Sequence, residues 1–477
     1  MFNIIRKFLL VAGGLLALAG LLALIALSVA DPQKYRHRIE QVLSQVTGMQ
    51  VEVKGPTRIL LLPAPGLRLE DFHVRNGESE WLSASAMDLR IRIIPLLCGK
   101  VEIGDVELVE PNLRIERDAE GGYNFIPERL PGDSEKWKPL KTRRFRAQDA
   151  DMTFTDQKSG EQVKIESCKL LIKDLEWKAA ASKTFELNMP DFRGNLSCGK
   201  IIYDELEAID LQVRASCQDR RLEISPITSK VLGGRLKGRL ESDFSGNSPN
   251  HSLELELSDF RVERFVQTFR EDKGAEGLAV FTAQLRCTGT ATSDMVGSLS
   301  GRAKLSGTEF VLYGVDMDKQ LARYESTQAF KLVDVVAFFV AGPIGMAVTK
   351  GYGFASIFAD TGSQTLIREL ISEWKIVNGI AQAHDVAMST AENRIALVGG
   401  LDFVNLQFKN MRVAVIDVEG CALVEQKIQG KFHDPVISDP NFLVTLAGPF
   451  IDTIQRGISF FTDYKCETFY AGRIESP

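Results

Sequence analysis

The chain has 477 residues, of which 44% are hydrophobic and 25% charged, values that are ordinary for a globular protein and argue against disorder. Its formal net charge is −6, whereas proteins that act on nucleic acid are usually basic, so no nucleic-acid partner is expected. The length suffices for two or three ordinary domains or for one elongated domain.

The first segment of interest, residues 8–30, carries no charged side chain. As a helix it is long enough to cross the roughly 30 Å hydrocarbon core of a bilayer. Residues 1–30 are therefore predicted to be an N-terminal transmembrane anchor. A cleaved signal peptide is the alternative, because residues 28–30 resemble a cleavage site, but the apolar run is longer than the usual signal core.

The orientation of this anchor follows from the size of what comes after it. Basic residues at positions 34, 36 and 38 slightly favour a cytoplasmic location for the following chain. Large domains are translocated largely regardless of such charges. We therefore expect a single-pass protein whose bulk lies on the far side of the membrane.

Residues 31–47 are predicted to form a short amphipathic helix. Asp31 suits the N-cap position and Pro32 the first turn. Apolar residues then recur at helical spacing, and Gly48 is suited to end the helix.

Beyond this helix the apolar residues recur with a period of two, as is typical of strands with one apolar and one charged face. Glycine-containing pairs at positions 76–77, 121–122, 233–234 and 399–400 indicate turns between the strands. A parallel α/β sheet would instead show continuous apolar strands. The expected fold class is therefore mainly β: an elongated, curled antiparallel sheet, groove-like or sandwich-like, with a few helices in addition to the transmembrane helix.

This pattern divides the chain into regions. We expect residues 31–130 to form an N-terminal β region with its leading helix, 149–330 a central region of β-hairpins, and 331–477 a C-terminal region with apolar helical segments. Within the last region, residues 332–349 and 442–461 are strongly apolar. They are predicted to be buried helices that cover the sheet, or else segments that touch a membrane or a partner.

Residues 131–148 are predicted to be a basic linker. The simplest interpretation is a solvated loop, and the alternative is a patch that contacts anionic lipid headgroups. The basic side chains of this run are Lys136, Lys138, Lys141, Arg143, Arg144 and Arg146.

No constellation of residues indicates catalysis. The five histidines lack metal-ligand spacing, and no nucleotide-binding or nucleophile motif is present in the sequence. The seven cysteines form no C-x-x-C pair, so most are expected to be small buried residues, with one or two disulfides possible. We therefore predict a protein that is not an enzyme and has no cofactor and no metal.

The order of these features resembles the N-terminal region of AsmA-family envelope proteins of Gram-negative bacteria. The C-terminal segments around residues 400–403 and 428–430 resemble the end of that family. The residues that carry the resemblance are Asp31, Thr47-Gly48, Gly55, Leu62-Pro63-Ala64-Pro65-Gly66-Leu67, residues 69–76, Ile94-Pro95-Leu96-Leu97, Gly99, Val109-Glu110-Pro111-Asn112-Leu113, Gly121, Gly122 and Asn124.

The resemblance implies an inner-membrane protein with its bulk in the periplasm, linked to outer-membrane assembly. It also implies lipid transport, because longer members resemble bridge-like lipid-transfer proteins whose curled sheet forms an apolar groove for acyl chains. Phospholipid and envelope proteins are then the expected partners. A second sheet or helices could cover the apolar face instead, and the protein could be a non-catalytic assembly factor. The candidate groove-lining residues are Val51, Val53, Leu67, Leu69, Leu89, Ile91, Ile93, Val101, Ile103, Leu113, Ile115, Leu253, Leu255 and Leu257.

Overall fold

The computed structural model is mainly β, with few and short helices, in agreement with the expected fold class. The structure describes residues 36–442 and 466–476, except for residues 38, 42, 45–47, 63, 93–102, 127–139, 178–189, 269–273, 315, 320, 322–362 and 440. The expected anchor and most of both apolar segments lie outside the described residues. The chain forms two compact units: unit 1 extends to Asp204 and includes Ile209–Arg220, and unit 2 comprises Glu205–Ala208 and Arg221 onward.

The strands of unit 1 include every described groove-lining candidate from Val51 to Ile115. A leading helix, described at residues 36–37, 39–41 and 43–44, precedes them and ends as expected at Gly48, which adopts a positive φ of 71°. The strands are β1 (Gln50–Val53), β2 (Thr57–Leu60), β3 (Gly66–Asn76), β4 (Ser79–Ile91), β5 (Ile103–Val109), β6 (Asn112–Arg117), β7 (Leu140–Asp156), β8 (Gln162–Trp177), β9 (Phe192–Tyr203) and β10 (Leu206–Gln218).

The sheet of unit 1 is mixed, which corrects the expectation of a purely antiparallel one. Strands β1 and β2 both pair with β3, which pairs with β4, and β4 pairs with both β5 and β6, all antiparallel. Strand β7 then pairs with β5 and β6 in parallel, and β8 and β9 continue antiparallel. The parallel register arises because a long connection carries the chain back to the start of β5.

The same strand corrects the predicted linker. Residues 140–148, the second half of that basic run, form the first part of β7. Their apolar positions were inconspicuous in the sequence because arginine occupies three of the neighbouring positions, yet Phe145 and Ala147 alternate with Arg144 and Arg146 in the strand pattern.

One cluster of apolar side chains covers one face of the sheet in unit 1. Val53, Leu69 and Phe72 are at its centre, and Ile39 and Leu43 of the leading helix pack against it. The helix therefore covers the apolar face over the first strands of the unit.

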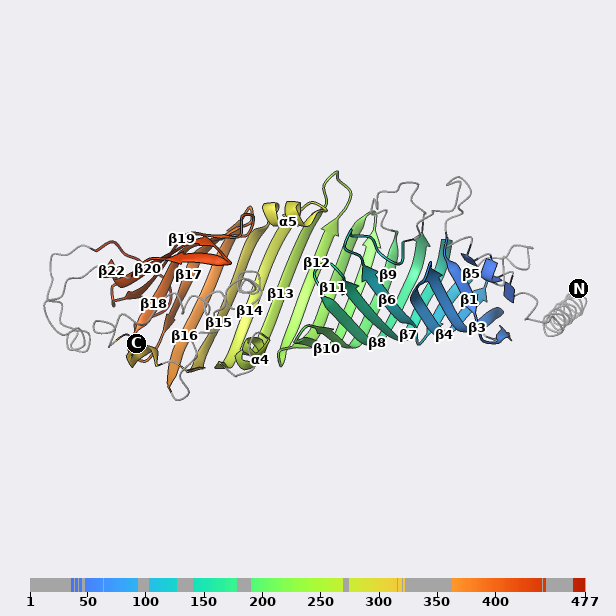
Figure 1. Ribbon diagram of the computed structural model, residues 1–477, viewed down its shortest axis with the longest axis horizontal. Helices are drawn as coiled ribbons and strands as arrows, with labels where there is room; N and C mark the ends of the chain where they lie inside the picture. The colour runs from blue at the N-terminus through green and yellow to red at the C-terminus, as the bar shows by residue number, and fades with distance from the viewer. Residues whose placement is uncertain are drawn as a thin grey trace, which may run out of the picture. The chain divides into compact units, whose positions relative to one another are not determined.

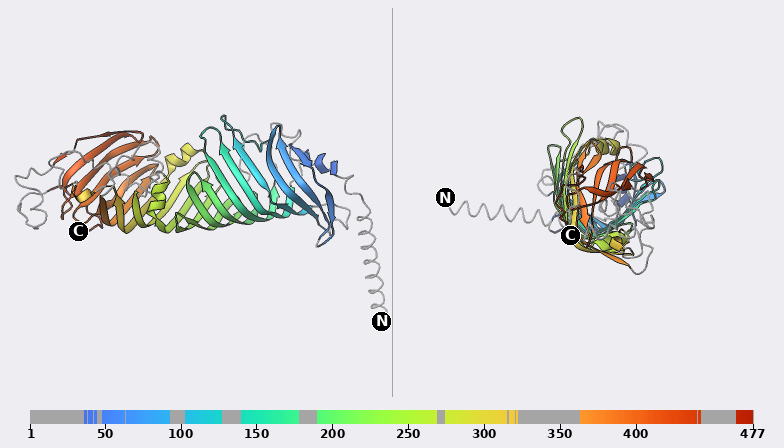
Figure 2. Two further views of the ribbon diagram at one scale, coloured as in Figure 1. Left: turned by 60° about the horizontal axis from the view of Figure 1, so that its bottom comes forward. Right: turned by 90° about the vertical axis from the view of Figure 1, so that its left-hand side faces the viewer.

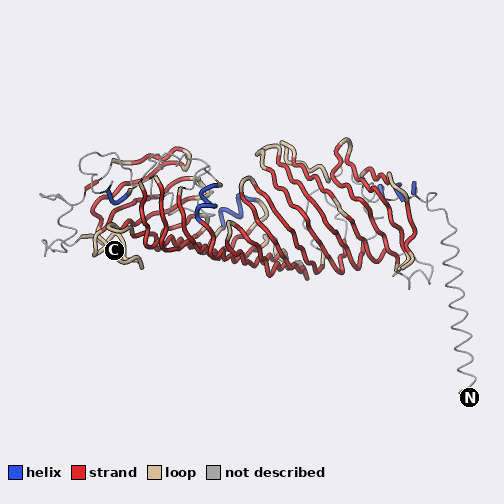
Figure 3. Tube along the Cα trace, turned by 90° about the horizontal axis from the view of Figure 1, so that it is seen from below, coloured by secondary structure: helices blue, strands red, loops and turns tan. Residues whose placement is uncertain are grey.

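Unit 2 is antiparallel, and its successive strands pair with one another in chain order (Figure 1). Two helices, α4 (Val262–Gln267) and α5 (Thr292–Ser298), lie at opposite ends of β14 (Figure 1). Figure 3 shows the described helices in blue among the strands in red. The strands are β11 (Arg221–Val231), β12 (Gly234–Asp243), β13 (Asn250–Arg261), β14 (Ala275–Thr288), β15 (Ser300–Tyr313), β16 (Gln364–Val377), β17 (Ile380–Ser389), β18 (Arg394–Asp402), β19 (Gln407–Ile416), β20 (Ala422–Lys431), β21 (Asp434–Ile437) and β22 (Asn441–Phe442).

The sheet of unit 2 curls strongly from β16 to β20, as the orange and red strands of Figure 2 show. A single cluster of buried side chains fills the inside of this curl, with Trp374, Met388 and Met411 among its largest members. The glycine pair at positions 399–400 lies inside β18 at a register shift, not in a turn as predicted. Glycine in a strand commonly marks such a bulge, and a Cβ on Gly399 would lie 2.4 Å from the carbonyl oxygen of Asn410.

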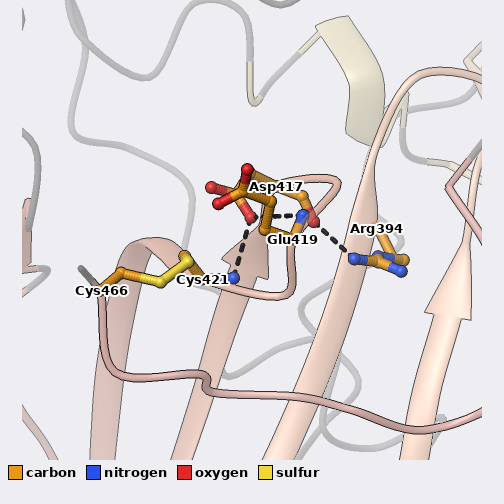
Figure 4. Close-up of a disulfide and its surroundings, with 5 residues drawn as sticks. All are labelled: Arg394, Asp417, Glu419, Cys421 and Cys466. Carbon is orange, nitrogen blue, oxygen red and sulfur yellow. Dashed lines mark hydrogen bonds between the residues drawn. A yellow bond between two sulfur atoms is a disulfide. The ribbon is translucent and has the colours of Figure 1, made fainter. Parts of the chain in front are cut away.

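Two disulfides join four of the seven cysteines, the upper end of the one or two that the sequence allowed. Cys168 and Cys198 are directly opposite each other on β8 and β9. Cys421, at the start of β20, is joined to Cys466 (Figure 4). Disulfides persist in oxidising compartments, so both bonds indicate a location outside the cytoplasm.

The C-terminal segment, residues 466–476, packs on the face of the sheet that is turned away from the main core of unit 2. Tyr470 and Ile474 are buried there, and the hydroxyl of Tyr470 donates a hydrogen bond of 2.6 Å to Asp385. Burial and this bond raise the pKa of Tyr470, so it stays protonated. Arg394 donates to the carbonyl oxygen of Ile474. It also donates to the carbonyl oxygen of Asp417, as Figure 4 shows.

Gly420 allows the C-terminal segment to approach the sheet. A Cβ on Gly420, whose φ is +82°, would lie 2.0 Å from the carbonyl oxygen of Tyr470. We expect Gly420→Ala to lower the stability of unit 2 by about 1–3 kcal/mol, because both the backbone and the close contact are strained. The fluorescence of Trp374 during urea unfolding, in a chain whose other three tryptophans are replaced by phenylalanine, measures this loss.

Gly233→Ala is the matched control for this substitution. Gly233 has a similar φ of +79°, but a Cβ there meets only the flexible side chain of Arg261, at 3.2 Å. Gly233→Ala therefore introduces the backbone strain without the close contact. It should lower the stability of unit 2 less than Gly420→Ala does. Equal losses would show that the C-terminal segment does not press on Gly420.

Candidate functional site

In unit 1 the candidate site is the apolar face of the strands that follow the leading helix. Near β1, β3 and β4 the apolar side chains are buried, whereas Ile165, Leu170 and Leu196 on β8 and β9 are only half-buried. The apolar face is thus covered at the start of the unit and partly open farther along it.

The register of β7, β8 and β9 arranges this open part in three cross-strand rows. In the middle row Ala150 lies opposite Cys168, which lies opposite Cys198. These three residues are small, and larger apolar side chains flank them on both sides. The flanking rows are Ala147, Leu170 and Leu196 on one side, and Met152, Ile165 and Ile201 on the other.

Unit 2 repeats this arrangement on β11–β16. Its middle row contains Gly238, Ala283 and Ala303, and it ends at Trp374 in the covered core. The complete middle row is Ile227, Gly238, Leu255, Ala283, Ala303 and Trp374. The rows beside it are Ile224, Leu240, Leu253, Leu285, Gly301 and Ile376, and Ser229, Leu236, Leu257, Phe281, Leu305 and Ser372.

Exposure also changes along these rows of unit 2, but here the open part comes first in the chain and the covered part follows. Leu240 on β12, Leu253 on β13 and Leu285 on β14 are half-buried, whereas Ile376 on β16 is 3% exposed. Small residues in the middle row leave space between the larger side chains beside them. An extended apolar molecule lying across the strands would contact both flanking rows and displace water from half-buried leucines.

The opposite face of β12–β16 is charged. It has a shallow cleft of about 520 Å³, which is lined by side chains of both signs, including Lys237, Glu254, Arg302 and Glu373. Across β12 and β13 the register places Lys237 opposite Glu256 and Arg239 opposite Glu254. Such cross-strand pairs of opposite charge are typical of a solvated sheet surface.

The described residues contain no group of three His, Cys, Asp or Glu side chains that could hold a metal ion. The unpaired Cys217 and Cys287 have raised thiol pKa values because they are buried, so they remain protonated and behave as small apolar residues. Among the described residues, no helix is long and apolar enough to span a membrane.

A family model for the AsmA family matches residues 4–175 and 136–386. The chain belongs to the AsmA family. The matches end before the segments around residues 400–403 and 428–430, whose resemblance to the end of the family stays a prediction. No curated protein and no solved structure matches the chain.

The structure separates the groove-lining residues predicted for this AsmA-family chain into the two units. Val51, Val53 and Leu69 are buried in the core of unit 1, and Leu89 and Leu113 pack against it. Leu253, Leu255 and Leu257 lie on β13 of unit 2, and their exposure falls from half-buried at Leu253 to 8% at Leu257. Three further residues of unit 1 are half-buried on its strands: Leu67, Ile91 and Ile115. Ile93, Val101 and the side chain of Ile103 lie outside the described residues.

The basic run does not form a free positive patch where it is described. Arg143 and Arg144 on β7 form ion pairs with Asp105, and Arg146 pairs with Glu107, both on β5. Contact with lipid headgroups stays a prediction, and these arginines would have to exchange their carboxylate partners to make it. Lys136, Lys138 and the side chain of Lys141 lie outside the described residues.

Sequence reasoning missed the open part of the apolar face in unit 1, and in unit 2 it found Leu253 and Leu255 on β13 but not the residues of the neighbouring strands. On β8 the alternation is interrupted at Ser167, which adopts a positive φ of 55°, so Ile165 and Leu170 do not stand in a single period-two run. On β12, β14 and β15 the small residues Gly238, Ala283 and Ala303 weaken the apolar signal. A search for period-two alternation that allows a one-residue shift at a bulge could have found Leu170 and Leu285.

Proposed function

We propose that this AsmA-family chain is an inner-membrane-anchored, single-pass protein with its bulk in the periplasm, where it holds phospholipid acyl chains. It would handle phospholipids between the envelope membranes or support outer-membrane assembly. The observation that carries the proposal is the half-open apolar face in each unit, with small residues in its middle row. The two disulfides support a location outside the cytoplasm, because disulfides persist in oxidising compartments.

The energetics favour hydrocarbon over water on these faces. Each CH₂ group that leaves a bilayer for water costs about 0.8 kcal/mol, so an acyl chain moves freely only along a continuous apolar surface. Rows of leucine provide such a surface within each unit, whereas the charged opposite face does not. Headgroups would remain in solvent at the edge of the strands.

Photo-crosslinking in the native membrane tests the proposal. Benzoylphenylalanine is placed at Leu253 or Leu196 on the apolar faces, and at the adjacent Glu254 or Ser197 on the opposite faces as matched controls. We expect phospholipid adducts, detected by mass spectrometry, at residues 253 and 196 only. Protein adducts without lipid at those positions would favour the non-catalytic assembly factor, and equal lipid labelling of both faces would contradict the proposal.

A further inference from the structure

The tip of the hairpin between β2 and β3 exposes two leucines. Leu61 is 40% exposed and Leu62 is 85% exposed. The backbone beneath them is held in place, because a guanidinium nitrogen of Arg90 donates to the carbonyl oxygens of Leu62, at 3.0 Å, and Ala64, at 3.4 Å. The tip therefore presents apolar side chains from a fixed loop.

The N-terminal end of the leading helix points toward the end of unit 1 that carries this tip. The amide of Val51 donates to Ser44 and the amide of Val53 donates to Glu40, so the helix lies antiparallel to β1. Strands β1 and β2 follow one another along β3, with Val53 opposite Phe72 and Leu60 opposite Gly66. Going back from residue 44 to residue 36 therefore leads toward the tip and away from the β3–β4 turn.

The chain that precedes this helix contains the apolar run at residues 8–30. Only residues 31–35 separate that run from the helix, and five residues reach at most about 18 Å. A bilayer that holds the run must then lie close to this end of unit 1. Arg58 on β2 also lies at this end. Its side chain is 67% exposed, and it would have to leave its ion pair with Glu70 to meet an anionic headgroup.

We propose that Leu61 and Leu62 form a second contact with the bilayer that holds the N-terminal run, inserting into its interfacial region. This contact would fix the angle at which unit 1 meets the membrane, which the anchor alone would not do. The inference rests on the anchoring part of the proposed function and is independent of lipid binding by the apolar faces.

The test uses the full chain, with its unpaired cysteines replaced by serine, reconstituted in vesicles of phosphatidylethanolamine and phosphatidylglycerol. An environment-sensitive fluorophore is attached at Leu62→Cys or, as the control at the opposite end of β3, at Glu78→Cys. We expect a blue-shifted emission at residue 62 and quenching by nitroxide-labelled lipids several times stronger than at residue 78. Water-like emission with equal quenching at both positions would overturn the proposal.

A second variant separates insertion from mere proximity to the membrane. Leu61→Asp in the Leu62→Cys background should reduce the quenching at residue 62 several-fold while leaving the chain resistant to carbonate extraction. Unchanged quenching would contradict insertion of the leucines. Loss of the whole chain on carbonate extraction would instead contradict the anchor, and so the two failures are distinguishable.

Discussion

Leu285→Glu should reduce the phospholipid recovered with the chain by at least about tenfold. Leu285 is half-buried on β14 and lies opposite Leu253 in a flanking row of the apolar face of unit 2. A carboxylate in contact with hydrocarbon costs several kcal/mol, and 1.4 kcal/mol already changes an equilibrium tenfold. Lipid adducts at residue 253, measured by the photo-crosslinking described above, give the readout.

The adjacent residue provides the control. Gln284→Glu adds the same charge on the same strand, but its side chain is exposed on the opposite face, and its lipid adducts should equal those of the unsubstituted chain. Leu196→Glu and Ser197→Glu form the corresponding pair in unit 1, read out by total bound phospholipid. If both leucine variants keep their lipid while remaining folded, the apolar faces do not bind it.

Trp374→Ala should lower the stability of unit 2 by about 3–5 kcal/mol, the usual cost of removing a buried aromatic side chain. Trp374 is 1% exposed and lies where the middle row enters the core enclosed by β16–β20. Its indole nitrogen also donates a hydrogen bond of 2.7 Å to Ser372. The midpoint of urea unfolding, followed by circular dichroism, measures the loss.

Trp374→Phe is the matched variant, because it keeps most of the apolar volume and removes only part of the indole ring. Its loss should be clearly smaller than that of the alanine variant. An alanine variant that unfolds at the same urea concentration as the unsubstituted chain would show that the curl of β16–β20 is not held by this core.

Local patterning predicted strands β1, β3, β4, β5, β6 and β13, because a half-buried strand shows a period of two in its own sequence. The run from Leu253 to Leu257 and the run from Leu113 to Ile115 are both in strands. The leading helix and Gly48 followed from local signals as well. These features depend on neighbours a few residues apart, and a single sequence carries that information.

The same reasoning could not predict which strands pair when they are far apart in the sequence. The parallel position of β7 beside β5 and β6, and the disulfide between Cys168 and Cys198, depend on which distant strands meet and in what register. The middle row of small residues arises only when β12, β14 and β15 are aligned, so no single strand reveals it. The candidate site is therefore a property of the register and not of any one motif.

The pairing order of the strands also has a consequence for folding kinetics. In unit 2 each strand from β11 to β15 needs only the next strand in the chain, so these hairpins have low contact order and can form one after another as the chain elongates. In unit 1, β5 pairs with β4 on one side, but its partner on the other side is β7, whose paired residues come 39 positions later in the chain, as Asp105 and Arg144 do. Until β7 has been made, β5 has an unpaired edge. The unfolded chain is therefore most prone to aggregate with other chains at that point of synthesis.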